Sequence, residues 1–120
     1  MAKNYVQDGR TIPVTNAGAT EILSGDAVVL GALVAIAITD IPAGFTGDGF
    51  TEGVFLLPKL PADDITAGAA VYLKDGQIQL EATDAVAAGI AWENASASTT
   101  VVEVKINVVA QSAAAAPANG

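Results

Sequence analysis

The chain has 120 residues, of which 52% are hydrophobic and only 15% are charged, and its formal net charge is −8. It contains no cysteine and no histidine, which excludes disulfides, thiolate metal sites and any catalytic triad that needs an imidazole base. The basic residues are few and widely spaced: Lys3, Arg10, Lys59, Lys74 and Lys105. We therefore expect a single domain that does not bind nucleic acid directly.

The hydropathy of the chain indicates an assembly component. A mean hydropathy of +0.48 is high for a small disulfide-free monomer, so part of the apolar surface is expected in subunit interfaces. The uncharged run from Ala27 to Thr39 is too short to span a bilayer, which takes about 20 residues. The first ten residues lack the apolar core of a secretory signal. We expect a protein made in the cytoplasm that does not enter a membrane.

The N-terminal segment reads as an arm followed by an edge strand. Residues 1–9 are polar and end in Asp8-Gly9, a strong turn dipeptide. Arg10 to Thr15 has β character, but Pro13 cannot donate a ladder hydrogen bond and so belongs at a sheet edge or a bulge. We assign residues 1–14 to the arm and edge strand.

An internal repeat organises the β domain, which we place at residues 15–109. The stretch Ile22–Leu30 is a glycine-centred turn that leads into a β-branched strand, and Ile65–Leu73 repeats it with five of nine positions identical. Such self-similarity predicts one domain built from two similar β-units, with the repeat at about 21–57 and 64–107.

The remaining elements are also strands. Val34–Thr39 and Thr99–Val109 alternate with a period of two. Residues 41–53 are rich in glycine and are expected to form a long loop, whereas Val54–Leu57 is a short apolar run typical of a strand buried on both faces. No amphipathic helix of three turns is present. We predict an all-β fold, a small barrel or sandwich, with a flexible alanine-rich tail at 110–120.

The sequence offers few candidate catalytic or ligand-binding groups, and they lack the spacing that such sites require. Asp63 and Asp64 are adjacent, so on an extended chain they point to opposite sides. The glycine-rich loop at 44–49 lacks the Gly-Lys-Ser/Thr ending of a phosphate cradle. Asp48 and Glu52 are possible calcium ligands without the full ligand spacing. We assign no catalytic, metal or cofactor-binding residue and expect a protein that is not an enzyme; cation binding by the acidic loop stays open.

Four segments resemble one known family. Ala2–Ile12, Ser24–Gly31 and Glu52–Lys59 occur in the family's order and spacing, and Ala67–Tyr72 fits the same pattern. They resemble the small phage proteins of the domain-of-unknown-function 2190 family, which are capsid decoration (cement) proteins, over roughly residues 2–108. The resemblance implies a β-rich homotrimer on the virion exterior. There it would bind the major capsid protein of an expanded tailed-phage head and stabilise contacts between capsomers.

The resemblance and the strand pattern together place two interfaces. An exposed polar arm suits strand addition to a partner's sheet edge, so we assign the capsid interface to the arm residues Lys3, Asn4, Tyr5, Val6, Gln7, Asp8, Gly9 and Arg10. The interface between subunits is assigned to Val54, Phe55, Leu57 and Trp92.

Two alternatives remain open from the sequence. One is another structural virion component, such as a head–tail connector or a tail-associated β domain. The other is a small β-barrel enzyme or ligand-binding protein, which a convergent polar pocket around Asp40, Asp48 and Glu52 would favour.

Overall fold

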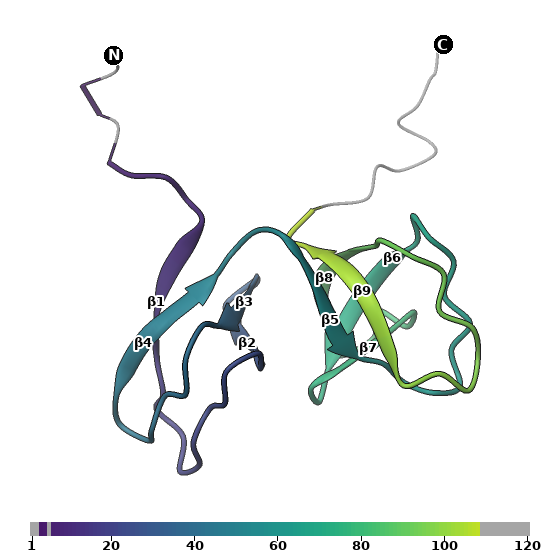
Figure 1. Ribbon diagram of the computed structural model, residues 1–120, viewed down its shortest axis with the longest axis horizontal. Helices are drawn as coiled ribbons and strands as arrows, with labels where there is room; N and C mark the ends of the chain where they lie inside the picture. Colours follow the sequence, from purple (N-terminus) through teal and green to yellow (C-terminus); the bar gives the residue numbers. More distant parts are fainter. Residues whose placement is uncertain (1–2, 5, 109–120) are drawn as a thin grey trace. The chain divides into compact units, whose positions relative to one another are not determined.

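The computed structural model describes residues 3–4 and 6–108, so the alanine-rich tail expected at 110–120 lies outside the described residues. Within these residues the chain forms nine strands and no helix, which confirms the all-β prediction. No described segment is a helix long and apolar enough to cross a membrane. The chain divides after Gly53 into two compact units, each with its own antiparallel sheet (Figure 1). We call them unit 1 and unit 2.

Unit 1 is a four-stranded sheet in the order β1-β4-β3-β2. Its strands are β1 (Thr11–Thr15), β2 (Ala27–Leu30), β3 (Leu33–Ala37) and β4 (Thr46–Phe50). β1 is an edge strand, as Pro13 predicted. The Asn16 N–H donates to the Phe45 carbonyl at 2.9 Å, and the alternation of an antiparallel pair then turns the backbone of Pro13 away from β4. The missing N–H of Pro13 therefore costs no ladder bond.

β4 corrects the expectation of a long loop at residues 41–53. The glycines that indicated a loop lie within this strand because interior side chains approach it closely. A Cβ on Gly47 would lie 2.8 Å from a side-chain carbon of Ile41, and one on Gly49 would lie 2.9 Å from the Cβ of Ala35. Both distances are shorter than carbon atoms tolerate. Glycine therefore makes room for the core in this strand.

The core of unit 1 is built from small and β-branched side chains. Val14, Ala35, Ala37 and Ile41 are buried at its centre, and four partly buried residues pack against them: Ile12, Ile22, Val28 and Leu30. Val34 and Ile36 are buried as well, so both faces of β3 are covered.

Unit 2 is a five-stranded sheet in the order β5-β9-β8-β6-β7. Its strands are β5 (Val54–Pro58), β6 (Ala70–Lys74), β7 (Gln77–Gln79), β8 (Val86–Ala91) and β9 (Val101–Ile106). Val102, Val104 and Ile106 of β9 are buried, in line with the predicted period of two. A further bridge joins Lys59 to Ile78, so the two ends of the sheet approach each other at that point.

β5 differs from its prediction as a strand buried on both faces. Leu57 is buried, but Val54 and Leu56 are exposed. Side chains alternate along β5, so Val54 and Leu56 lie on the exposed face of the sheet and Leu57 lies on the covered face. A continuous apolar run therefore does not distinguish a central strand from an edge strand with an apolar outer face.

The two sheets share one pairing pattern. β1 pairs with β4 from Thr11↔Phe50 to Thr15↔Thr46, and β5 pairs with β9 from Val54↔Lys105 to Pro58↔Val101. β2 with β3, and β6 with β8, form the matching second pair. β7 has no counterpart in unit 1 and extends the edge of the sheet beyond β6.

The turn that precedes the second strand is also the same in both units. The Gly25 N–H donates to the Ala37 carbonyl, and the Gly68 N–H donates to the Ala91 carbonyl, each at 2.8 Å. Both glycines have φ of 91°, a conformation that other residues rarely adopt. The stretches Ile22–Leu30 and Ile65–Leu73, which are similar in sequence, thus make equivalent backbone contacts.

Candidate contact surfaces

The arm is exposed throughout its described length. Lys3, Asn4 and residues 6–10 are all exposed, and Val6 reaches 88%. Tyr5, which was assigned to the capsid interface, lies outside the described residues. β1 begins only at Thr11, so the described arm residues precede the sheet of unit 1. Their polar groups and the Val6 side chain are accessible to a partner.

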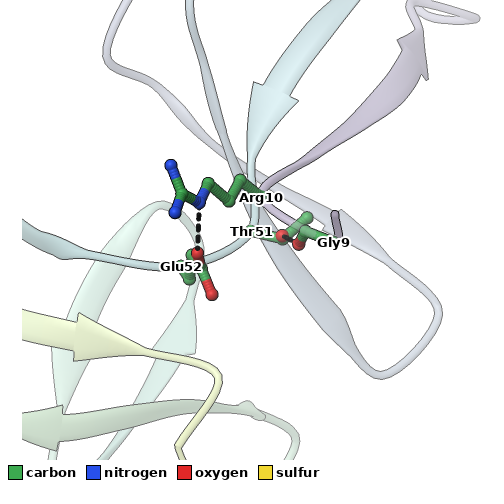
Figure 2. A network of polar contacts seen from close by, with 4 residues as sticks. All are labelled: Gly9, Arg10, Thr51 and Glu52. Atoms are coloured by element: carbon green, nitrogen blue, oxygen red, sulfur yellow. Dashed lines mark hydrogen bonds and ion pairs between the residues drawn. The ribbon is translucent and has the colours of Figure 1, made fainter. Parts of the chain in front are cut away.

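The base of the arm is fixed to the end of β4 (Figure 2). The Thr51 N–H donates to the Arg10 carbonyl at 2.8 Å, and the Thr51 hydroxyl donates to the Gly9 carbonyl. Arg10 Nε also lies 3.3 Å from a carboxylate oxygen of Glu52. These contacts set the point at which the arm leaves unit 1.

A second exposed surface lies on unit 2, and we call it the β5–β9 face. It is formed by alternate side chains of the two strands: Val54, Leu56 and Pro58 from β5, and Val101, Glu103 and Lys105 from β9. Leu56 is 62% exposed and Val101 45%. Alternation along a strand places these residues on one side of the sheet, where they form an uncovered apolar strip with charged neighbours.

Trp92 extends this face beyond the end of β8. Its N–H donates to the Glu103 carbonyl at 2.8 Å, and its side chain is 53% exposed. The Lys105 ammonium lies 5.8 Å from the centre of the indole ring, within the range of a cation–π contact. An exposed tryptophan next to apolar side chains is a common anchor of protein interfaces.

The four residues assigned to a subunit interface fall in different environments. Val54 and Trp92 are exposed, Phe55 is half-buried, and Leu57 is 1% exposed. Leu57 is taken up by the interior of unit 2 and presents almost no surface to a partner. The sequence analysis did not single out Leu56 and Val101 as exposed apolar residues. Alternation along a strand with one exposed face, applied to β5, would have indicated Leu56.

A hollow of about 260 Å³ lies on the β5–β9 face. Its lining combines apolar residues (Leu56, Ala95, Val101 and Val102) with polar and acidic ones (Glu93, Asn94, Ser96, Thr99 and Glu103). Two of the polar groups already have partners. The side-chain amide oxygen Oδ1 of Asn94 accepts from the Ala67 N–H at 2.8 Å, and the Thr99 hydroxyl donates to the Ser96 carbonyl at 2.6 Å.

Two of the three acidic residues considered for a ligand pocket serve local structure in unit 1. Asp40 accepts the Ser24 N–H at 2.8 Å, and Glu52 pairs with Arg10. Asp48 lies exposed on β4. Over the part of the chain that the structure describes, no cluster of three acidic side chains is arranged to hold a metal ion.

Comparison with known proteins identifies the family. The family model described as phage cement protein matches residues 6–106, which cover both sheets. No curated protein and no solved structure gives a significant match. The match agrees with the resemblance found in the sequence and favours a structural role over a catalytic one. The chain belongs to the phage cement protein family.

Proposed function

We propose that this protein decorates the outer surface of an expanded tailed-phage head and stabilises contacts between capsomers of the major capsid protein. The observation that carries the proposal is the family match over residues 6–106. The exposed arm and the β5–β9 face support it, because a decoration subunit needs surfaces for the shell and for neighbouring copies.

The arm is the proposed contact with the shell. Most of residues 3–8 are polar, and the described ones are exposed, which suits addition of this segment as a strand to a sheet edge of the capsid protein. The bonds from Thr51 to the carbonyls of Gly9 and Arg10 fix the base of the arm before it binds, which lowers the entropy cost of binding.

Val54, Phe55 and Trp92 are the proposed contacts between copies in a homotrimer. Val54 and Trp92 supply the exposed apolar area, and the half-buried Phe55 supplies less. A trimer carries three arms, so three weak contacts with the shell act together and retention becomes much stronger than one contact allows. Because the protein would bind only the assembled, expanded shell, it would stabilise that state by mass action.

Deletion of residues 2–9 tests the role of the arm. Expanded heads without the decoration protein would be mixed with intact or truncated protein, and occupancy measured by co-sedimentation over a concentration series. We expect the truncated protein to need at least about tenfold more protein for half-occupancy, the equivalent of 1.4 kcal/mol. Its thermal unfolding should change little, because the deletion ends before β1 and removes only the exposed hydrogen bond from the Thr51 hydroxyl to Gly9.

The outcomes distinguish a failure of the proposed arm contact from a failure of the proposed decoration function. Equal occupancy by the truncated protein would contradict the role of the arm and leave decoration intact. Failure of the intact protein to bind expanded heads would contradict decoration itself. Imaging of virions supplies a second test: density for the chain as a single ring at one vertex would identify a connector instead.

A further inference from the structure

The hollow on the β5–β9 face is lined by both apolar and acidic side chains. Leu56 and Val101 supply exposed apolar lining, Glu93 and Glu103 supply carboxylates, and no basic residue lines it. Its volume of about 260 Å³ lies below the roughly 300–1,000 Å³ typical of small-molecule and cofactor sites. The hollow therefore suits one long side chain of a partner protein better than a cofactor.

The two carboxylates that line the hollow favour a cationic partner. Lys105, the basic residue of β9, directs its ammonium toward the Trp92 ring and does not line the hollow. The whole chain carries a formal charge of −8, so a second copy brings net repulsion to two glutamates. A basic segment of a different protein brings attraction instead.

The edge of β5 that faces away from β9 also offers backbone hydrogen-bonding groups to a partner. The Lys59 N–H donates to the Thr100 carbonyl at 2.9 Å, and the alternation of an antiparallel pair then turns the backbone N–H and C=O of Leu56 away from β9. In unit 1 the equivalent position is Pro13, which has no N–H. Pro58, the next residue that faces this edge, also lacks an N–H, and Lys59 beyond it bridges to Ile78. An extended segment can therefore hydrogen-bond to β5 before Pro58, at Leu56, where β1 lacks the donor.

Unit 1 also serves as an internal control for the apolar lining. The position of Val101 is occupied there by Thr46, and that of Glu103 by Asp48, at the same places in the same strand pairing. The fold thus accepts threonine where unit 2 has an exposed valine. Val101 is 45% exposed, so burial within the described structure does not account for its apolar side chain.

We infer that this hollow receives a lysine or arginine side chain from an extended segment of the shell protein that pairs with the free edge of β5. The aliphatic part of that side chain covers Leu56 and Val101, and its cationic group lies between Glu93 and Glu103. The inference rests on the proposed decoration function and adds the chemistry of the partner. Val54 and Trp92 lie outside the hollow and remain available to a neighbouring copy.

Binding of the full-length protein to decoration-free expanded heads tests this inference. E93Q/E103Q removes both charges with little change in shape, and V101T introduces the residue that unit 1 carries. The matched controls lie in unit 1: D48N removes the carboxylate at the position equivalent to Glu103, and T46V makes the reverse change at the position equivalent to Val101. We expect at least about tenfold weaker binding for E93Q/E103Q, a smaller loss for V101T and no change for the controls. E93Q/E103Q should also reduce the salt dependence of binding.

Cross-linking identifies the occupant directly. The chain has no cysteine, so S96C can carry a single photoreactive maleimide at the rim of the hollow. After irradiation on heads, we expect the cross-linked peptide to come from the shell protein and to contain a lysine or arginine.

Each outcome decides the matter. If intact protein binds but E93Q/E103Q and V101T bind equally well, the inference is wrong and decoration stands. If the cross-linked peptide comes from this chain, or if V101T changes the oligomeric state in solution, the hollow belongs to a contact between copies. If intact protein does not bind heads, the proposed function fails first.

Discussion

The two units solve the same packing problem with different side chains. In unit 1, the buried Ala35 lies against Gly49, whose absent Cβ would be 2.9 Å from that of Ala35. At the equivalent positions unit 2 has Gly89 and Val104. A Cβ on Gly89 would first meet the backbone carbonyl of Lys105, so the glycine of this pair makes room for a side chain in unit 1 and for backbone in unit 2.

A second difference concerns the buried polar residue that follows the first strand of each unit. Asn16 and Lys59 occupy the same place, since each donates its backbone N–H across the strand pair, to Phe45 and to Thr100. The Asn16 amide donates to the carbonyls of Thr20 and Ile41, both at 2.8 Å. The Lys59 ammonium donates to carbonyls of its own loops, those of Leu60, Thr99 and Pro61 at 2.9, 3.1 and 3.4 Å. The position requires a hydrogen-bond donor, which either side chain supplies.

The largest effect is expected from Gly89→Ala. Gly89 has φ of 149°, and a Cβ there would lie 2.0 Å from the backbone carbonyl oxygen of Lys105. Because backbone cannot yield as a side chain can, we expect a loss of at least about 4 kcal/mol in the free energy of unfolding, or failure to fold. Chemical denaturation measures it.

Ala35→Gly is the control for Gly89→Ala, because Ala35 occupies the position in unit 1 that is equivalent to Gly89. Unit 1 already has glycine at position 49 and needs no space at position 35, so the loss should be about 1 kcal/mol, from backbone entropy and a small void. Equal losses for the two variants would show that the close approach of the Lys105 backbone to Gly89 does not explain why the two units carry different residues at this position.

Lys59→Met should have the next largest effect. The side chain is 1% exposed, and methionine keeps much of its length but cannot donate to the three carbonyls. Those of Leu60 and Pro61 keep the N–H groups of Asp63 and Ser98 as donors, whereas that of Thr99 loses the Lys59 ammonium. We expect a loss of about 3 kcal/mol, read from urea or guanidinium unfolding. Lys105→Met, at an exposed position of the same unit, should change stability by no more than about 0.5 kcal/mol. A comparably small change at Lys59 would contradict the requirement for a donor.

The smallest effect is expected at the exposed ion pair of Arg10 and Glu52. Their side chains are 74% and 61% exposed, so solvent screens the attraction, and Glu52→Gln should cost less than about 0.5 kcal/mol. The measurement is thermal unfolding at low and high salt, where the difference from the unaltered protein should shrink as salt is added. A loss that grew with salt would rule out a simple ion pair.

Several features followed from sequence alone because they depend on local chemistry. The period of two in Val102, Val104 and Ile106 identified β9, and Pro13 identified an edge strand because a missing donor cannot lie within a ladder. The likeness of Ile22–Leu30 to Ile65–Leu73 reflects a glycine turn with the same φ in both units. The family resemblance came from the order of such local segments, and the family match agrees with it.

Other features were decided only when the strands came together. Glycine fits the strand at positions 47 and 49 because the side chains of Ile41 and Ala35 occupy the space where a Cβ would lie. Leu56 is exposed and Leu57 is buried because successive residues of β5 face opposite sides of the sheet and only one side is covered. The hollow gathers Leu56 with residues of the loop between β8 and β9 and of β9 itself. Composition and periodicity report how one segment is built, whereas neighbours across a sheet determine which face is covered and which residues meet.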